Sequence, residues 1–483
     1  MAAAVPAERP TAAESWRRGD AWVLLAITAV AFALRLQGVR DWSLSPSEVA
    51  TWQAVTMPLD GEHGFFASPF AAHPLALLAL RALLDHGVLP FVGEGWLRLP
   101  AVFAGTLTVP LFALAARHVL ARGAVLLAAA LLALHPWHIG ASQAFAPPVF
   151  AVGGVVLALL AAMAGRGWPA RTAAVLLAAA ACATDRSGCL VVPMLLGAVA
   201  ATRWQAAVGR ARWLALALGA AAVLLPLALQ LGFGVPFDAG GDPGLAGAAA
   251  RQFGPSVWGP ALLAAWLVRP APVALVAAAW APLAGLALVA GTGHSVAAED
   301  GLAALPLLLA LAAAAVHAVA VRVRATGPGL ATALGATAVP AALLVALAVG
   351  AALRGTVYGG DRSPWRAAAD AVLRAKQAGR DLVVTAGEGR ASLQFYLRPN
   401  EWRGAATDPH PGLRVAALGD GAPTADDGAA VQVLVLRSAE WERLVAPAGA
   451  ADALRQAWEL QRVLPCPREF GDGSVYLLRR RGG

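Results

Sequence analysis

The stretch VFAVGGVVLALLAAM, at residues 149–163, contains no charged or polar side chain. A helix needs roughly 17–25 predominantly apolar residues to cross a lipid bilayer, and fewer where other helices surround it. Lipid offers no hydrogen-bond partner for peptide N–H and C=O groups, so a segment in that environment must bond internally as a helix. The stretch therefore predicts a membrane-spanning helix.

Similar apolar runs recur along the chain, at residues 21–36, 101–114, 124–134, 214–231 and 331–353. Of the 483 residues, 59% are hydrophobic and only 14% are charged, whereas a soluble domain carries about 25% charged residues. The sequence therefore predicts a multi-pass α-helical membrane protein with about eleven spanning helices, in preference to a soluble protein with buried helices.

Arginine is concentrated in alternate short loops between these runs. The arginine-rich loops contain Arg117, Arg122, Arg166, Arg171, Arg203, Arg210, Arg212, Arg269, Arg322 and Arg324, and the other loops contain Asp238, Asp242, Glu299 and Asp300. Positively charged short loops stay in the cytoplasm. We therefore expect a multi-pass protein of the cytoplasmic membrane, with a cytoplasmic tail at residues 1–20 and spanning helices within residues 21–354. The net charge of +8 follows from these loops and does not indicate nucleic acid binding.

Two regions outside the spans are more polar. Residues 38–96 form the first outer loop, in which residues 73–84 are expected to be an interfacial helix. Residues 355–483 alternate between helical and strand patterns, which predicts a small soluble α/β domain. The expected helices are residues 364–379 and 454–463, and the expected strands are residues 381–385, 431–436 and 474–479. An odd number of spans places this domain outside the cytoplasm, where a structural or recruiting role is expected.

The predicted outer surface collects most candidate functional groups, namely Glu48, His73, Arg98, Gln143, Asp185 and Arg186. Ionisable groups near membrane depth are costly, so they are usually functional. Each also has a simpler interpretation: Arg98 as an interfacial anchor, Glu48 as a solvated loop acid, and Asp185 with Arg186 as an exposed pair at a turn. The three cysteines, Cys182, Cys189 and Cys466, have no metal-binding spacing and form no disulfide framework.

Four motifs follow one another between residues 43 and 148. They are S-L-S-P-S-E (43–48), H-P-L-A-L (73–77), R-L-P-A-V-F-A-G (98–105) and H-P-W-H-I-G-A-S-Q-A-F-A-P-P (135–148). In order and in spacing they resemble membrane glycosyltransferases of the GT-C class, in particular the protein O-mannosyltransferase and aminoarabinose-transferase-like family with its galacturonosyltransferase-like members. The segment that begins S-P-W-R-A-A at residue 363 also resembles the W-R-x-A-A helix after the last span of that family.

The resemblance implies a reaction in which a sugar moves from a polyprenyl-phosphate carrier to a glycan, lipid or protein acceptor at the outer face of the membrane. An Asp in the first motif is the family's general base, and basic residues neutralise the carrier phosphate. Transferred to this sequence, the resemblance makes Glu48 and Asp185 the catalytic candidates and His73, Arg98, Gln143 and Arg186 the substrate-binding candidates. No cofactor follows from the residues, and a divalent metal stays an alternative.

The sequence also departs from the family pattern. The catalytic Asp position is Ser47, and Ala144, Ala146 and Pro148 replace the family's Glu, Arg and Tyr. The family's Thr-His pair is here Thr184-Asp185. Loss of a general base typically costs ~10²–10⁴-fold in rate. Two hypotheses follow: an active glycosyltransferase, or an inactive GT-C scaffold that binds the lipid carrier or assembles other proteins. A transporter is disfavoured because internal repeats and mid-helix charges are lacking.

Overall fold

The computed structural model divides the chain into two compact units, which are described separately. The membrane unit comprises Met1–Gln37, Gly64–Leu80 and Arg98–Leu353, and the loop-and-sheet unit comprises Gly38–His63, Arg81–Leu97 and Arg354–Gly483. Apart from single positions, the structure describes residues 16–37, 43–56, 73–88, 94–164, 167–195, 298–325, 364–376, 382–397, 413–417, 431–445, 450–465 and 474–481.

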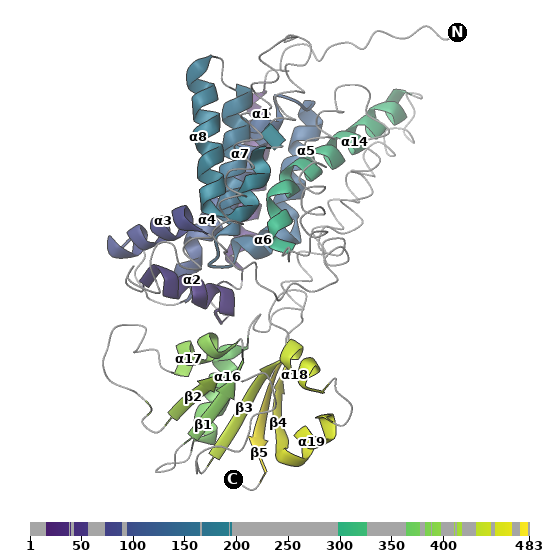
Figure 1. The fold of residues 1–483 in the computed structure, drawn as a ribbon. Helices are drawn as coiled ribbons and strands as arrows, with labels where there is room; N and C mark the ends of the chain where they lie inside the picture. The colour runs from purple at the N-terminus through teal and green to yellow at the C-terminus, as the bar shows by residue number, and fades with distance from the viewer. Residues whose placement is uncertain are drawn as a thin grey trace. The chain divides into compact units, whose positions relative to one another are not determined.

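Helices dominate the described part of the membrane unit (Figure 1). They are α1 (Arg18–Leu36), α3 (Pro74–Asp85), α4 (Glu94–Ala116), α5 (Arg122–Leu134), α6 (Pro136–Ser142), α7 (Pro148–Ala164), α8 (Trp168–Thr184) and α14 (Leu305–Ala325), with 3-10 helices η3 (Arg186–Leu190) and η4 (Ala298–Ala304). α3 ends and α4 begins within residues of the loop-and-sheet unit. The interfacial helix predicted at residues 73–84 is confirmed as a helix by α3.

Three of the described helices are long and apolar enough to cross a membrane, namely Arg18–Leu36, Glu94–Ala116 and Gly301–Val321. The bent pair α5 and α6 adds a fourth if it counts as one span. The chain is therefore an integral membrane protein, and the total of about eleven spans stays a prediction. The sequence also predicts spans at residues 213–232, 257–268, 271–291 and 329–353, all of which lie outside the described residues.

The sequence predicts a third span over residues 123–139, around the apolar run at residues 124–134, but this span is not one continuous helix. α5 ends at Leu134, α6 begins at Pro136, and their axes differ by 56°. A proline has no N–H to continue the hydrogen bonds of a helix, and it pushes the preceding residue into an extended conformation. His135 has this conformation, with φ −67° and ψ 118°. Pro136 therefore breaks the span.

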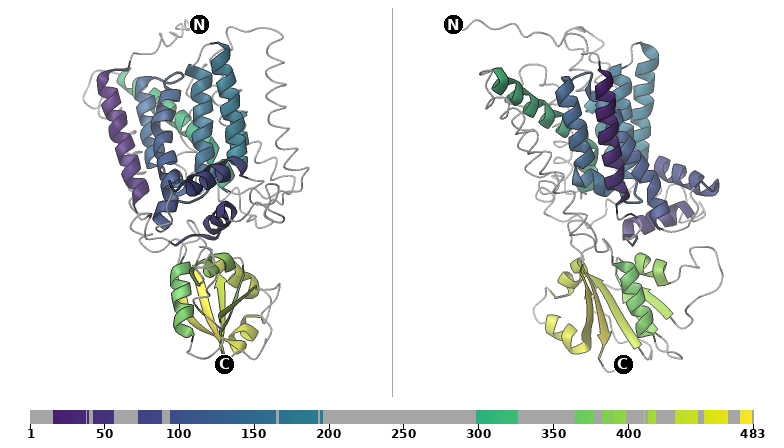
Figure 2. Two further views of the ribbon diagram at one scale, coloured as in Figure 1. Left: turned by 90° about the vertical axis from the view of Figure 1, so that its left-hand side faces the viewer. Right: turned by 180° about the vertical axis from the view of Figure 1, so that it is seen from behind.

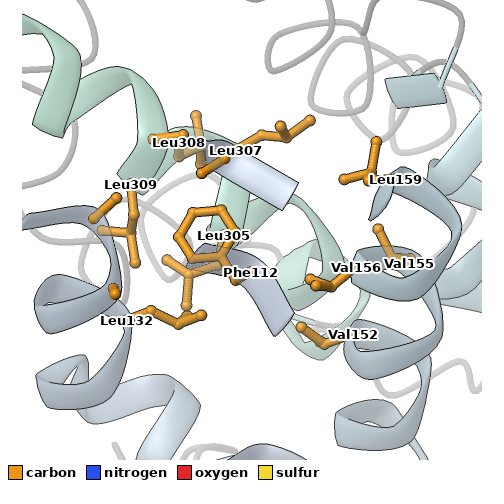
Figure 3. Close-up of a cluster of buried hydrophobic side chains, with 14 of the residues drawn as sticks. Phe112, Leu132, Val152, Val155, Val156, Leu159, Leu305, Leu307, Leu308 and Leu309 are labelled. Carbon is orange, nitrogen blue, oxygen red and sulfur yellow. The ribbon is translucent and has the colours of Figure 1, made fainter. Parts of the chain in front are cut away.

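Apolar side chains from four helices form the core of the membrane unit. Figure 3 shows Phe112 of α4, Leu132 of α5, Val155 of α7 and Leu305 of α14 within one buried cluster. α7 and α8 lie side by side in both views of Figure 2 and pack against each other. Small residues permit this approach, because a Cβ atom on Gly154 would lie 3.1 Å from the Cβ atom of Ala181.

α1 and α5 run in the same direction, as polar contacts at both ends demonstrate. Near their starts, Arg122 Nε donates to Asp20 Oδ1 over 2.8 Å. Near their ends, Arg35 Nη1 donates to the carbonyl oxygen of Ala133 over 3.2 Å. The arginine pattern predicts this direction, because the first and third spans both rise from the cytoplasm in the expected topology.

A five-stranded mixed sheet forms the centre of the loop-and-sheet unit. Its strands are β1 (Leu382–Ala386), β2 (Leu413–Ala417), β3 (Val431–Arg437), β4 (Trp458–Leu464) and β5 (Val475–Arg480), in the order β2-β1-β3-β5-β4. β1 pairs in parallel with β2 and β3, whereas β5 pairs antiparallel with β3 and β4. The helices are α2 (Pro46–Thr56), α16 (Trp365–Ala375), α17 (Arg390–Leu397), α18 (Ser438–Val445) and α19 (Ala450–Ala457).

Alternate residues of β3 serve opposite faces of the sheet. Val433 and Val435 join the core that includes Trp365 of α16, whereas Leu434 and Leu436 join a second cluster with α18 and α19. Side chains of a strand alternate between faces with a period of two, so a strand apolar on both sides needs helices on both sides. The predicted α/β layer domain is confirmed.

The helix predicted at residues 454–463 is wrong in its second half. α19 ends at Ala457, and the chain continues as β4, which pairs antiparallel with β5 through an irregular register between Leu460 and Arg462. The segment has no clean two-residue alternation, because five consecutive β4 side chains are exposed. Pairing with β5 therefore overrides the local pattern. α2, α17, β2 and α18 were also not predicted.

Candidate functional site

The turn between α8 and η3, which we call the hairpin tip, holds a buried carboxylate. Asp185 lies between α8 and η3 in an extended conformation, with φ −160° and ψ 149°. Its Oδ1 accepts a hydrogen bond of 2.8 Å from the backbone N–H of Ser187. An Asp side chain commonly satisfies the first N–H groups of a helix in this way. The local sequence therefore fixes the position of the carboxylate.

A residue distant in the sequence contacts the same carboxylate. His73, which directly precedes α3, has its Nδ1 2.9 Å from Asp185 Oδ2. The side chain of Asp185 is 4% exposed and that of His73 is 24% exposed. Burial raises the pKa of Asp185, but the contacts with His73 and Ser187 outweigh burial, and the pKa is lowered overall. A carboxylate against one ring nitrogen orients the histidine ring.

Arg35, which the sequence did not single out, is completely buried at the end of α1. Its Nη2 lies 2.6 Å from His138 Nδ1, and its Nε donates to Ser142 Oγ over 3.2 Å. Its Nη1 donates to the carbonyl oxygens of Ala31 and Ala133. We call these residues the Arg35 lock. An arginine is always protonated, so His138 accepts at Nδ1. The lock also stabilises the break after α5, because Arg35 bonds the carbonyl oxygen of Ala133, one of the last carbonyls of α5, which have no partner within the helix.

Two further motif residues support the lock. Gln143 Nε2 donates to the carbonyl oxygens of Leu34 and Gln37, over 3.0 and 2.9 Å, at the end of α1. Gly105 leaves no space for a Cβ atom, because the Ser142 side chain fills it. The amide nitrogen of Gln143 is therefore engaged in the fold, and its predicted substrate contact stays a prediction. His138 and Ser142 are four residues apart on one helix face, a spacing that indicates a shared partner.

Glu48 lies in the first turn of α2, in the loop-and-sheet unit. Its Oε2 accepts from the N–H of Ser45 over 2.9 Å, and its own N–H donates to Ser45 Oγ over 3.3 Å. This reciprocal pair is a capping box, for which S-x-x-E is the sequence signal. Glu48 is buried, whereas Ser47 is exposed. The geometry gives Glu48 a structural role, and its catalytic role stays a prediction.

The two remaining candidates are described less fully. Arg98 is buried near the start of α4 and has interaction partners within the protein. Arg186 is the first residue of η3, and its side chain lies outside the described part of the structure. Their predicted contacts with a carrier phosphate stay predictions.

The described residues were also compared with the requirements of a metal site. Within them, no three His, Cys, Asp or Glu side chains gather in a way that could hold a metal ion. Cys182 and Cys189, on either side of the hairpin tip, are both free thiols. A divalent metal therefore has no ligand set among the side chains that the structure describes.

In sequence, no family model and no curated protein matches the chain. In structure, the apo form of ArnT from Cupriavidus metallidurans is 16% identical, with 96% of this chain and 98% of ArnT covered and a TM-score of 0.50. The oligosaccharyltransferase AglB from Archaeoglobus fulgidus, in complex with an inhibitory peptide and a dolichol-phosphate, is 12% identical, with 95% and 74% covered and a TM-score of 0.52. An Archaeoglobus fulgidus oligosaccharyltransferase with zinc and sulfate is 14% identical, with 92% and 72% covered and a TM-score of 0.50.

These similarities define the fold. The chain has the GT-C membrane fold, as its motifs predicted, and the match with ArnT covers 96% of the chain. The structures that share it include ArnT and AglB. At this level of identity the likeness defines the fold, and the activity must be argued from the site.

Proposed function

We propose that this chain is a membrane glycosyltransferase that moves a sugar from a polyprenyl-phosphate carrier to an acceptor at the outer face of the cytoplasmic membrane. The observation that carries the proposal is the buried Asp185 carboxylate against the partly exposed His73, within a GT-C fold. The AglB structure with dolichol-phosphate supports the carrier class. The acceptor is a glycan, lipid or protein.

This chain has Ser47 at the position of the family's catalytic aspartate. In the proposed reaction the Asp185–His73 pair takes over the role of that aspartate. His73 takes the proton of the acceptor hydroxyl through the ring nitrogen that does not face Asp185, and Asp185 stabilises the resulting imidazolium. The acceptor oxygen bonds to the anomeric carbon of the sugar, the bond from that carbon to the phosphate oxygen breaks, and the carrier phosphate leaves. Arg98 and Arg186 are the proposed partners of that phosphate. The Archaeoglobus fulgidus structure with zinc supports a divalent metal as an alternative, but no described side chains would hold one, and the proposed reaction does not use it.

The orientation of the chain is part of the proposal. The loop-and-sheet unit joins Gly38–His63 of the first outer loop to Arg354–Gly483. Segments of one compact unit must lie on the same side of a membrane. If the arginine-rich loops lie in the cytoplasm, the first outer loop lies on the opposite side of the membrane. Its membership of the same unit supports an extracytoplasmic position for the C-terminal domain.

A second function is favoured by a different observation. Ser47, Ala144 and Ala146 lack the catalytic groups of the family pattern, and the carboxylate of Glu48 takes part in a capping box. An inactive GT-C scaffold that binds the lipid carrier or assembles other proteins would need none of these groups.

One experiment separates the two functions. The full chain, purified into lipid nanodiscs, is incubated with a panel of radiolabelled polyprenyl-phosphate sugars and with glycan, lipid and peptide acceptors, and carrier binding is measured in parallel. Transfer of label by the wild-type chain supports the glycosyltransferase. Carrier binding with no transfer to any acceptor supports the scaffold.

A further inference from the structure

The beginning of the first outer loop is buried although its sequence is largely polar. Ser43 is 1% exposed and Leu44 is completely buried. The backbone N–H of Leu44 donates to Tyr396 Oη over 2.6 Å, and the backbone N–H of Arg366 donates to Ser43 Oγ over 3.2 Å. All four residues belong to the loop-and-sheet unit. Residues of the C-terminal domain therefore bond the loop through its backbone as well as through a side chain.

One of these C-terminal residues, Arg366, also contacts the other end of the loop. Arg366 Nη2 lies 2.7 Å from Glu94 Oε1 at the start of α4. The guanidinium carbon of Arg366 lies 5.8 Å from the centre of the Tyr396 ring, within the range of a cation–π contact. Arg366 thus links Ser43 and Glu94, which lie near the two ends of the loop.

The base of this arrangement is rigid. Trp365, the first residue of α16, is completely buried, and its ring fills the space that a Cβ atom on Gly389 would need. Gly389 directly precedes α17, which carries Tyr396 and packs against α2. Close packing of Trp365 on the start of α17 therefore fixes Tyr396 and Arg366 relative to each other.

The loop continues from this attachment into the capping box of Ser45 and Glu48. Residues 43–48 are therefore held on one side by Arg366 and Tyr396 and on the other by the first turn of α2. Ser47 lies within this first turn of α2, is exposed and occupies the position of the family's catalytic residue.

We infer that Arg366 and Tyr396 are positioning residues, through which the C-terminal domain holds residues 43–48 in a single conformation for sugar transfer. Transfer depends on the backbone conformation of this segment, because the Asp185–His73 pair supplies the proposed base and neither Ser47 nor Glu48 reacts. The inference gives the C-terminal domain a role that composition and motifs leave open. Its catalytic part rests on the proposed function, whereas the attachment itself does not.

The attachment is tested by hydrogen exchange on the full chain in nanodiscs. Tyr396→Phe removes only the hydroxyl that accepts from Leu44. We expect the amides of residues 43–48 to exchange about fivefold faster, the factor that corresponds to a lost hydrogen bond of about 1 kcal/mol, with β1 and β3 unchanged. Tyr476→Phe is the matched control, because Tyr476 stacks on Trp441 elsewhere in the same unit. Unchanged exchange at residues 43–48 in Tyr396→Phe would overturn the inference.

The positioning role is tested by charge exchange. Arg366→Glu should lower kcat for transfer while the carrier Kd stays at the wild-type value, and the double variant Arg366→Glu with Glu94→Arg should recover kcat. Faster exchange at residues 43–48 without any change in kcat would overturn the positioning role and leave the proposed function intact. A wild-type chain that transfers no sugar would overturn the proposed function and the positioning role together, and the exchange experiment would then decide on the attachment alone.

Discussion

The hairpin tip and the start of α2 each bury a carboxylate, but the two carboxylates have different partners. Glu48 bonds Ser45, three residues away, in a capping box. Asp185 contacts His73, which belongs to a distant part of the chain and is partly exposed. A capping carboxylate stabilises its own helix, whereas a carboxylate behind an accessible histidine can support chemistry. The comparison teaches that burial alone does not identify a catalytic acid.

The largest expected effect is at the hairpin tip. Asp185→Asn keeps the size of the side chain but removes the charge that orients His73, so we expect transfer to fall by ~10²–10⁴-fold, the range for a lost general base. Carrier binding should stay near the wild-type value. The measurement is single-turnover transfer of labelled sugar, with Asp85→Asn as the control, because Asp85 forms an exposed helical pair with Arg81. Equal transfer rates in Asp185→Asn and Asp85→Asn would show that the Asp185 carboxylate does not support catalysis and would remove its contrast with Glu48.

A second expected effect concerns the Arg35 lock, which serves the fold alone. Gly105→Ala places a methyl group where the Ser142 side chain lies, and overpacking of this kind typically costs about 1–3 kcal/mol. We expect a lower midpoint of thermal unfolding in detergent. Gly19→Ala is the control, because no atom lies within 4 Å of a Cβ atom there. A wild-type midpoint for Gly105→Ala would contradict the close packing.

At the start of α2 we expect a smaller effect on stability. Glu48→Gln keeps the capping geometry with a weaker acceptor, and loss of a cap costs about 0.5–2 kcal/mol. Unfolding should therefore shift modestly, while transfer stays within a fewfold of the wild-type rate. Abolished transfer with unchanged folding would instead identify Glu48 as the base and reverse the comparison.

The smallest effect is expected at the neighbouring position. Ser47→Asp restores the family residue, but Ala144 and Ala146 still lack the carboxylate and guanidinium of the later motif. We therefore expect transfer rates to change by no more than a fewfold in the same assay. A large gain in rate from this single change would indicate that the other departures do not limit the reaction.

Part of this picture could be predicted from the sequence. Uninterrupted apolar runs predict helices because lipid permits little else, and the GT-C motifs predicted the fold. Pro136 is a local signal for a break in a helix, and S-x-x-E at residues 45–48 is a local signal for a helix start. The break after α5 and the capping role of Glu48 are therefore both encoded in the local sequence.

Other features depend on contacts between distant residues. Arg35 lies at the end of an apolar run, and nothing near it in the sequence indicates His138 or Ser142 as partners. β4 is a strand because β5 lies beside it, and its own residues do not alternate. The contact of His73 with Asp185 likewise depends on the packing of the membrane unit. Such pairings need a folded chain or covarying homologues to be seen.

The polar contacts at the two ends of α1 also have a consequence for the surrounding lipid. Asp20 and Arg35 are 15 residues apart (35 − 20), which corresponds to about 22 Å of helix rise. The hydrocarbon core of a typical bilayer is about 30 Å thick. Both side chains are buried within the protein, so the surface that α1 presents to lipid is set by exposed apolar residues such as Trp22, Leu25 and Val30. α1 therefore carries an acidic and a basic side chain within bilayer depth without exposing either charge to lipid.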